Sequence, residues 1–143
     1  MGTMTVDDII VTPLKRINVA GGDVLHAMKC SDQGFVSFGE AYFSNINQGA
    51  VKAWKRHVRM TLNLVVPIGK VGFVFIDEKG SRRKEVVGAD RYVRLTVPPG
   101  IWFGFKGLAA PSSLLLNVAD IPHDPDEIEL QAIEAFMINW ENQ

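Results

Sequence analysis

The chain has 143 residues, of which 47% are hydrophobic and 22% charged, a composition ordinary for one globular domain with a substantial core. Fifteen Lys and Arg against sixteen Asp and Glu give a net charge of -1, which argues against nucleic acid as a partner. One cysteine, Cys30, excludes an intramolecular disulfide.

We predict a single domain over residues 1–143, with an N-terminal arm over about 1–20, a barrel over about 21–122 and a tail over 123–143. The first residues lack the apolar core of a signal peptide, and no apolar run reaches the length that spans a bilayer. We therefore expect a cytoplasmic protein without a membrane partner.

The N-terminal segment 6–18 is typical of a short strand or arm, in which Pro13 suits a sheet edge. Such arms often pair with a neighbouring subunit, so a homodimer is expected. After a turn at Gly21 and Gly22, residues 24–28 predict a short strand. Residues 35–43 alternate as a strand, and residues 45–49 are rich in turn formers.

Residues 49–77 combine a cationic run with two apolar runs, 62–66 and 71–76, which Pro67 and Gly69 divide. Further strands are predicted at 91–97, 101–105 and 113–118, and short strands with regular turns indicate an all-β sandwich or barrel. After Asp124 and Pro125, an acidic first turn and helical spacing of apolar residues predict a short C-terminal helix.

Three fragments together resemble the jelly-roll (cupin) proteins, and within them the dTDP-4-dehydrorhamnose 3,5-epimerase and dTDP-sugar isomerase family. The fragments are FGEAYFS at 38–44 with GAVKAWK at 49–55, VPPGIWFGF at 97–105, and LNVAD at 116–120. The resemblance implies a double-stranded β-helix barrel. It also implies a dTDP-linked 4-keto-6-deoxy sugar as ligand, and epimerisation or keto-isomerisation in surface-polysaccharide synthesis. Proton transfer alone needs no cofactor.

The sequence departs from the pattern of that family at its catalytic positions. The family's catalytic histidine falls on Lys55 and its phosphate-binding arginine on Lys52, while its second histidine falls on Phe103 and its tyrosine near Leu116. An alternative is therefore a degenerate cupin that binds a nucleotide sugar or carbohydrate without turning it over.

Metal binding is not expected, although many cupins are metalloenzymes. The stretches that resemble the metal-binding motifs of cupins offer Lys55, His57 and Phe103. One ligand cannot hold a metal ion.

The cationic run over residues 51–59 is the strongest functional signal. If it is extended, Lys55, His57 and Arg59 share one side of the strand. Lys52, Trp54 and Arg56 then share the opposite side. Like charges at a barrel mouth need a counterion, which a pyrophosphate would provide. The alternative is a solvated edge strand whose cations pair with acidic side chains.

Catalysis would need a base and an acid. A free histidine titrates near neutral pH, so His57 needs no help to act as a base, whereas a lysine such as Lys55 would need burial or neighbouring cations, and the sequence leaves both open. Tyr42 is the candidate acid.

The remaining candidates would bind substrate. Lys52 and Arg59 would contact phosphate. Trp54 and Trp102 would stack on a base or sugar, or else belong to the core or to a dimer interface. Asn117 and Asp120 lie where a closing strand meets the mouth. Asp120 would orient a histidine, bind a sugar hydroxyl or cap the following turn.

Overall fold

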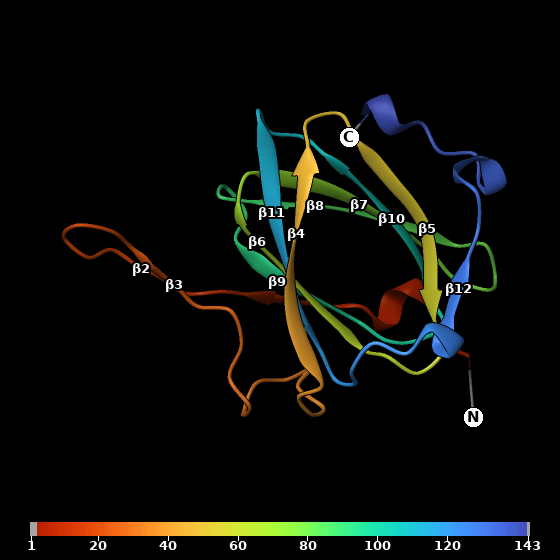
Figure 1. The fold of residues 1–143 in the computed structure, drawn as a ribbon, viewed down its shortest axis with the longest axis horizontal. Coiled ribbons are helices and arrows are strands. Elements are labelled where there is room, and N and C mark those ends of the chain that lie inside the picture. The colour runs from red at the N-terminus through yellow and green to blue at the C-terminus, as the bar shows by residue number, and fades with distance from the viewer. Residues whose placement is uncertain (1–2, 143) are drawn as a thin grey trace.

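The computed structural model describes residues 3–142, which form two antiparallel sheets that face each other around one core (Figure 1). The first sheet contains, in spatial order, β1 (Ile10–Pro13), β9 (Val93–Val97), β6 (Leu62–Ile68), β11 (Ser112–Ala119) and β4 (Glu40–Asn47). The second contains β12 (Ile128–Leu130), β5 (Val51–His57), β10 (Trp102–Gly107), β7 (Lys70–Ile76) and β8 (Arg82–Gly88). The predicted jelly-roll fold is confirmed.

The turn between β6 and β7 carries the chain from the first sheet to the second. Gly69 adopts a φ of 91°, and a Cβ atom there would lie 2.3 Å from the hydroxyl oxygen of Ser113, so no other residue fits the turn easily. On β7, Phe73 and Phe75 point into the main core, whereas Val74 and Ile76 point to the other face of the sheet. Both faces of this sheet are thus covered.

The N-terminal segment joins its own barrel. A 3-10 turn, η1 (Val6–Asp8), leads into β1, which pairs with β9 of the same chain. The next residues form a hairpin of β2 (Arg16–Ile17) and β3 (Val24–Leu25), which extends away from the two sheets in Figure 1. This hairpin exposes Ile17, Val19 and Val24.

Several strand limits differ from those predicted. The strand expected over 35–43 begins only at Glu40. Gly39, just before it, lies so close to the backbone of Ile121 that a Cβ atom would approach that backbone to 2.1 Å. The strand then continues to Asn47, through part of the predicted turn. The strand expected over 24–28 pairs only at Val24 and Leu25.

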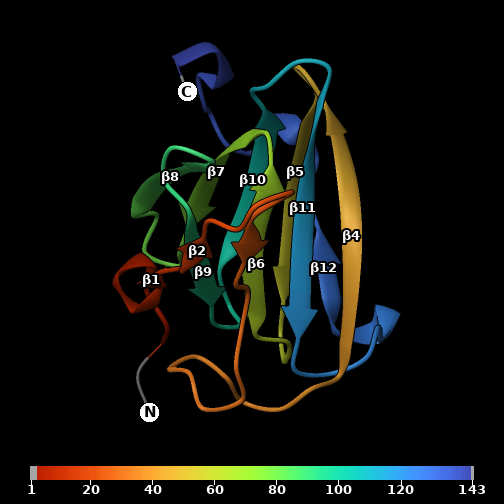
Figure 2. The ribbon, with the colours of Figure 1, turned by 90° about the vertical axis from the view of Figure 1, so that its left-hand side faces the viewer.

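The predicted α-helical tail is wrong. Residues 128–130 form strand β12, which pairs with β5 and covers its edge. Two 3-10 turns follow, η3 (Ile133–Ala135) and η4 (Trp140–Asn142), and the segment between them packs on the outer face of the second sheet. Figure 2 shows this tail outside the barrel. No helix within residues 3–142 has the length and apolar character needed to cross a membrane.

Candidate functional site

A cavity of about 290 Å³ lies between the two sheets. Its hydrocarbon wall comes from β6, β10 and β11 and consists of Leu62, Leu64, Phe103, Phe105 and Leu115. Its polar side chains come from β4, β5 and β11 and are Tyr42, Ser44, Lys52, Lys55, His57 and Asn117. The described residues that line this cavity include two lysines and no Asp or Glu, so the cavity suits an anionic guest with an apolar part.

A bulge in β5 brings Lys52 to the cavity. Lys55 lies opposite Phe103 of β10, and Lys52 lies opposite Phe105, so three steps along β5 match two steps along β10. Strict alternation predicted Lys52 and Lys55 on opposite sides of the strand, and that prediction is wrong. Lys52 is exposed, Lys55 is half-buried and His57 is buried, so positive charge extends from the rim inwards.

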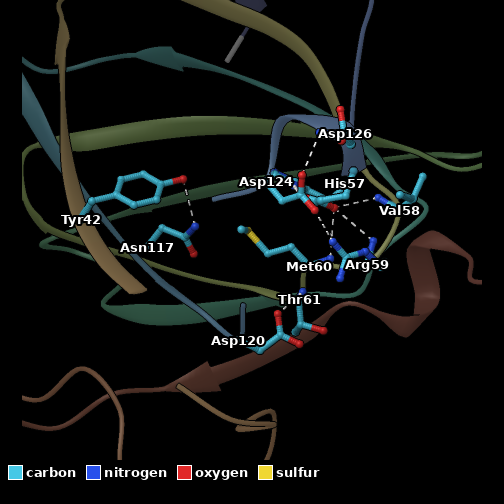
Figure 3. Close-up of polar contacts among 11 residues, drawn as sticks. Tyr42, His57, Val58, Arg59, Met60, Thr61, Asn117, Asp120, Asp124 and Asp126 are labelled. Atoms are coloured by element: carbon cyan, nitrogen blue, oxygen red, sulfur yellow. Dashed lines mark hydrogen bonds and ion pairs between the residues drawn. The ribbon is translucent and has the colours of Figure 1, made fainter. Parts of the chain in front are cut away.

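His57 is held by a carboxylate that the sequence did not identify. Glu127 lies at the end of the 3-10 turn η2 (Pro125–Glu127), and its Oε1 accepts a hydrogen bond from His57 Nδ1 (Figure 3). Its Oε2 accepts from the backbone N–H groups of Val58, Arg59 and Met60 at 3.1, 3.1 and 3.3 Å. Because an ionised carboxylate only accepts, Nδ1 carries the proton and Nε2 is left as the basic nitrogen.

The environment of Glu127 keeps it ionised. Burial alone raises the pKa of Glu127, but the hydrogen bond from His57 and those from the Arg59 and Met60 N–H groups outweigh burial, and the pKa lies below its ordinary value. A permanent negative charge at this place stabilises a protonated His57. The pair therefore suits a histidine that accepts and returns a proton.

Phe103 lies beside the His57 ring. The two rings are nearly parallel, at 13°, with centroids 6.1 Å apart. Phe103, which the family resemblance aligned with a histidine, thus forms an apolar wall next to the candidate base.

Tyr42 and Asn117 form a second polar pair, on the first sheet. Asn117 Nδ2 donates to the Tyr42 hydroxyl oxygen at 3.1 Å, and Asn117 Oδ1 accepts from the backbone N–H of Asn63 at 3.2 Å. The amide of Asn117 therefore has a fixed orientation, and the hydroxyl proton of Tyr42 is free for another acceptor. Figure 3 shows Tyr42 and His57 on different sides of the site.

Trp54 and Trp102 do not serve as stacking platforms in the cavity. Trp54 borders the cavity, but its indole packs edge-on against Phe136 at 5.1 Å and donates to the Ile133 carbonyl at 3.0 Å. Trp102 belongs to the same outer cluster, and the Arg56 guanidinium lies over the Trp102 ring, 4.7 Å from the ring centre. Their alternative assignment to a core is the correct one.

Two other predicted ligand residues also lie outside the cavity. Arg59 is exposed and forms an ion pair with Asp124. Asp120 Oδ1 accepts from the Thr61 backbone N–H at 2.8 Å, so it holds the turn after β5 and does not orient a histidine. Neither residue lines the cavity. Within residues 3–142, no group of three or more His, Cys, Asp and Glu side chains gathers as metal ligands would.

One signal in the sequence marks the turn that ends at Glu127. Asp124 and Pro125 start a turn in which Asp124 accepts from the Asp126 N–H at 3.0 Å, whereas the same residues in the sequence predict the start of a helix. The turn lasts only three residues. It places Glu127, which is 2% exposed, directly behind His57.

Comparison with known proteins gives a consistent picture, although no model of a protein family matches the chain. The dTDP sugar isomerase of Desulfovibrio desulfuricans G20 is 35% identical, with a TM-score of 0.91 over 96% of this chain and 94% of that one. The dTDP-6-deoxy-D-glucose-3,5-epimerase RmlC of Legionella pneumophila, solved with dTDP-4-keto-L-rhamnose, has a TM-score of 0.75 at 15% identity, covering 92% of this chain and 77% of that one. The latter likeness concerns the fold alone.

One curated protein also matches part of the chain. The probable low-salt glycan biosynthesis epimerase Agl13 of Haloferax volcanii is 29% identical in an alignment of 97 residues that covers 61% of this chain. The match spans 62% of that protein's length. With its jelly-roll barrel and its near full-length likeness to the Desulfovibrio structure, this chain belongs to the dTDP-sugar isomerase family.

Proposed function

We propose that the protein is an epimerase or keto-isomerase of a dTDP-linked 4-keto-6-deoxy sugar in the synthesis of a surface polysaccharide. The single observation that carries this proposal is the buried pair of His57 and Glu127, in which His57 lines a cavity that also presents two lysines and Glu127 lies behind the histidine. A pocket that only bound sugar would have no need of an ionised carboxylate behind a histidine. The relatives act on, or were solved with, dTDP sugars, which supports the same substrate class.

His57 acts as the base in this proposal. Its Nε2 removes a proton from a carbon next to the ketone, and the resulting imidazolium is stabilised by Glu127. The electron pair of the broken C–H bond moves toward the ketone, which becomes an enolate. Return of a proton to the same carbon on the other face gives an epimer, and return to the former ketone carbon with loss of a hydroxyl proton gives a keto-isomer.

The exposed end of β5 would hold the diphosphate. Lys52 lies at the rim, where its Nζ donates to the Asn45 carbonyl at 3.2 Å and remains open to solvent. A diphosphate at Lys52 places the sugar further in, toward His57. There the hydrocarbon wall suits the deoxygenated carbon of a 6-deoxy sugar.

Solvent exchange tests this function. The protein is incubated in deuterated water with dTDP-4-keto-6-deoxyglucose, and the sugar is followed by NMR and mass spectrometry. We expect deuterium at a carbon next to the ketone, together with a changed configuration or a moved ketone. Tight binding of the nucleotide sugar without any exchange would leave only the alternative of a binding protein.

We propose further that the protein acts in the cytoplasm as a homodimer. One cysteine and no disulfide suit a reducing compartment. The exposed apolar side chains of the β2–β3 hairpin and of the edge strand β4, among them Ile17, Val24 and Phe43, support contact with a second copy. Light scattering of the purified protein measures the mass, and a monomer at micromolar concentration would contradict the dimer.

A further inference from the structure

Lys55, like Lys52, has no carboxylate partner among the described residues, unlike the other cations of β5 and of the turn that follows. Arg56 pairs with Glu129, His57 with Glu127 and Arg59 with Asp124. Among the described residues, no Asp or Glu comes within ion-pair distance of Lys55, and none lines the cavity that Lys55 faces. A half-buried ammonium group without an acidic partner is available to a ligand.

The strand sets the position of Lys55 relative to the base. Lys55 and His57 are two residues apart beyond the bulge of β5, so both face the cavity with Cα atoms about 7 Å apart. Lys52 lies on the rim side of the bulge and His57 lies at the buried end. Lys55 is therefore the cation nearest to the part of the cavity where the sugar would lie.

The chemistry of enolate formation needs a positive charge at this place. When His57 takes the proton, the C–H electron pair forms a carbon–carbon double bond and the ketone π pair moves onto oxygen, which becomes negatively charged. Hydrocarbon side chains form one wall of the cavity, and Phe103 of that wall lies directly opposite Lys55 in the strand pairing. In such surroundings a fixed ammonium donor stabilises the oxyanion more strongly than water does.

We propose that Lys55 binds the ketone oxygen of the substrate and stabilises the enolate, as an ammonium group that neither transfers the proton nor holds the diphosphate. This inference rests on the proposed function and adds a role that separates Lys55 from Lys52. The lysine forms no covalent bond with the substrate. Its charge is the same before and after the proton transfer.

Substitution of Lys55 by a neutral residue of similar length tests the role. In Lys55→Met, we expect the deuterium exchange rate at saturating substrate to fall about 10²- to 10³-fold. The affinity for dTDP, measured by calorimetry, should change by less than about threefold, which also shows that the variant is folded. Lys55→Arg should recover part of the exchange. Lys84→Met, at an exposed position on β8, is the matched control and should behave as the wild type.

Several outcomes would overturn the assignment. If Lys55→Met weakens dTDP binding tenfold and exchanges normally at saturation, Lys55 is a phosphate ligand, and the proposed function still stands. If borohydride treatment during turnover attaches the sugar to Lys55, the lysine forms an imine and its role is covalent. If the wild-type protein binds dTDP and exchanges no deuterium, the proposed function fails, and the role of Lys55 fails with it.

Discussion

The Nδ1 nitrogen of His57 and the Oε1 oxygen of Glu127 form a buried hydrogen bond although 70 positions separate them in the chain. The bond depends on the pairing of β12 with β5, because Glu127 lies just before β12 and Ile128 pairs with His57 across the sheet. Folding of the tail onto β5 therefore completes the candidate site. A carboxylate at this place fixes both the proton and the orientation of the imidazole.

Glu127→Gln should lower catalysis more than binding. The amide keeps an oxygen for the N–H groups of Val58 and Arg59 and turns its NH2 group toward His57. Nδ1 then has to accept, the proton moves to Nε2, and the base is lost. We expect deuterium exchange to fall about 10²- to 10⁴-fold, while dTDP affinity stays close to that of the wild type. Near-normal exchange in this variant would show that the pair is structural.

The lowered pKa of Glu127 also predicts how stability depends on pH. A carboxyl group whose pKa is lower in the folded state contributes stability that is fully present above its ordinary value of 4.5 and is lost as pH falls through the folded value. Urea unfolding of the wild type and Glu127→Gln should show a difference in free energy that narrows below about pH 4.5. The other acidic groups contribute equally to the free energy of unfolding of both proteins, so their contributions cancel in the difference. A difference that stays constant down to pH 3 would contradict the pKa shift.

Periodicity and turn residues predicted an all-β sandwich or barrel, and the family resemblance predicted the jelly roll among these. Phe73 and Phe75 alternate on β7 toward the core and Gly69 forms the turn before this strand, and both signals are visible in the sequence. The site was harder, because two of its features depend on pairing between distant segments. The bulge that turns Lys52 inward exists only against β10, and the strand after Glu127 exists only against β5.

The prediction that Trp54 and Trp102 stack on the ligand was wrong because it too depended on contacts between distant segments. Trp54 and Trp102 occur on strands that border the cavity, but the tail covers the outer face of those strands. Both indoles pack against the tail there. Acidic and apolar residues after Pro125 have the spacing of a helix, and spacing alone does not tell a short helix from an added strand with turns. The contacts with Phe136 and Trp140 decide between the two.

Lys52→Met should weaken dTDP binding if the rim holds the diphosphate. Loss of a charge-assisted hydrogen bond costs about 1.5–3 kcal/mol, so we expect the Kd measured by calorimetry to rise about 10- to 100-fold. The affinity of the variant should also depend less on salt concentration than that of the wild type. Arg59→Gln is the comparison, because Arg59 pairs with Asp124 outside the cavity. An equal loss of affinity in both variants would place the phosphates elsewhere.

Trp102→Ala should destabilise the fold without affecting the ligand. Trp102 is 8% exposed in the outer cluster, and truncation of a buried tryptophan costs about 3–5 kcal/mol. We expect that loss in the free energy of unfolding from urea titration, with dTDP affinity within about threefold of the wild type at a temperature where the variant is folded. The control is Phe38→Ala, at a side chain 66% exposed, which should change stability by about 0.5 kcal/mol or less. A stable Trp102→Ala variant that had lost dTDP binding would restore the stacking role.

Tyr42→Phe separates removal of the proton from its return. Tyr42 belongs to the first sheet and His57 to the second, so a sugar between them would meet the base and the acid from different sides. Without the hydroxyl, His57 can still take a proton and give back deuterium, whereas inversion at that carbon should slow about 10²- to 10⁴-fold. We therefore expect recovered substrate that contains deuterium and keeps its original configuration, as measured by NMR. Because Asn117 donates to the hydroxyl oxygen of Tyr42, Asn117→Asp is a second test. The introduced carboxylate would accept the hydrogen bond of the Tyr42 hydroxyl and keep its proton from the sugar, so inversion should also slow. Inversion at the wild-type rate in Tyr42→Phe would show that the acid is another group or a water molecule.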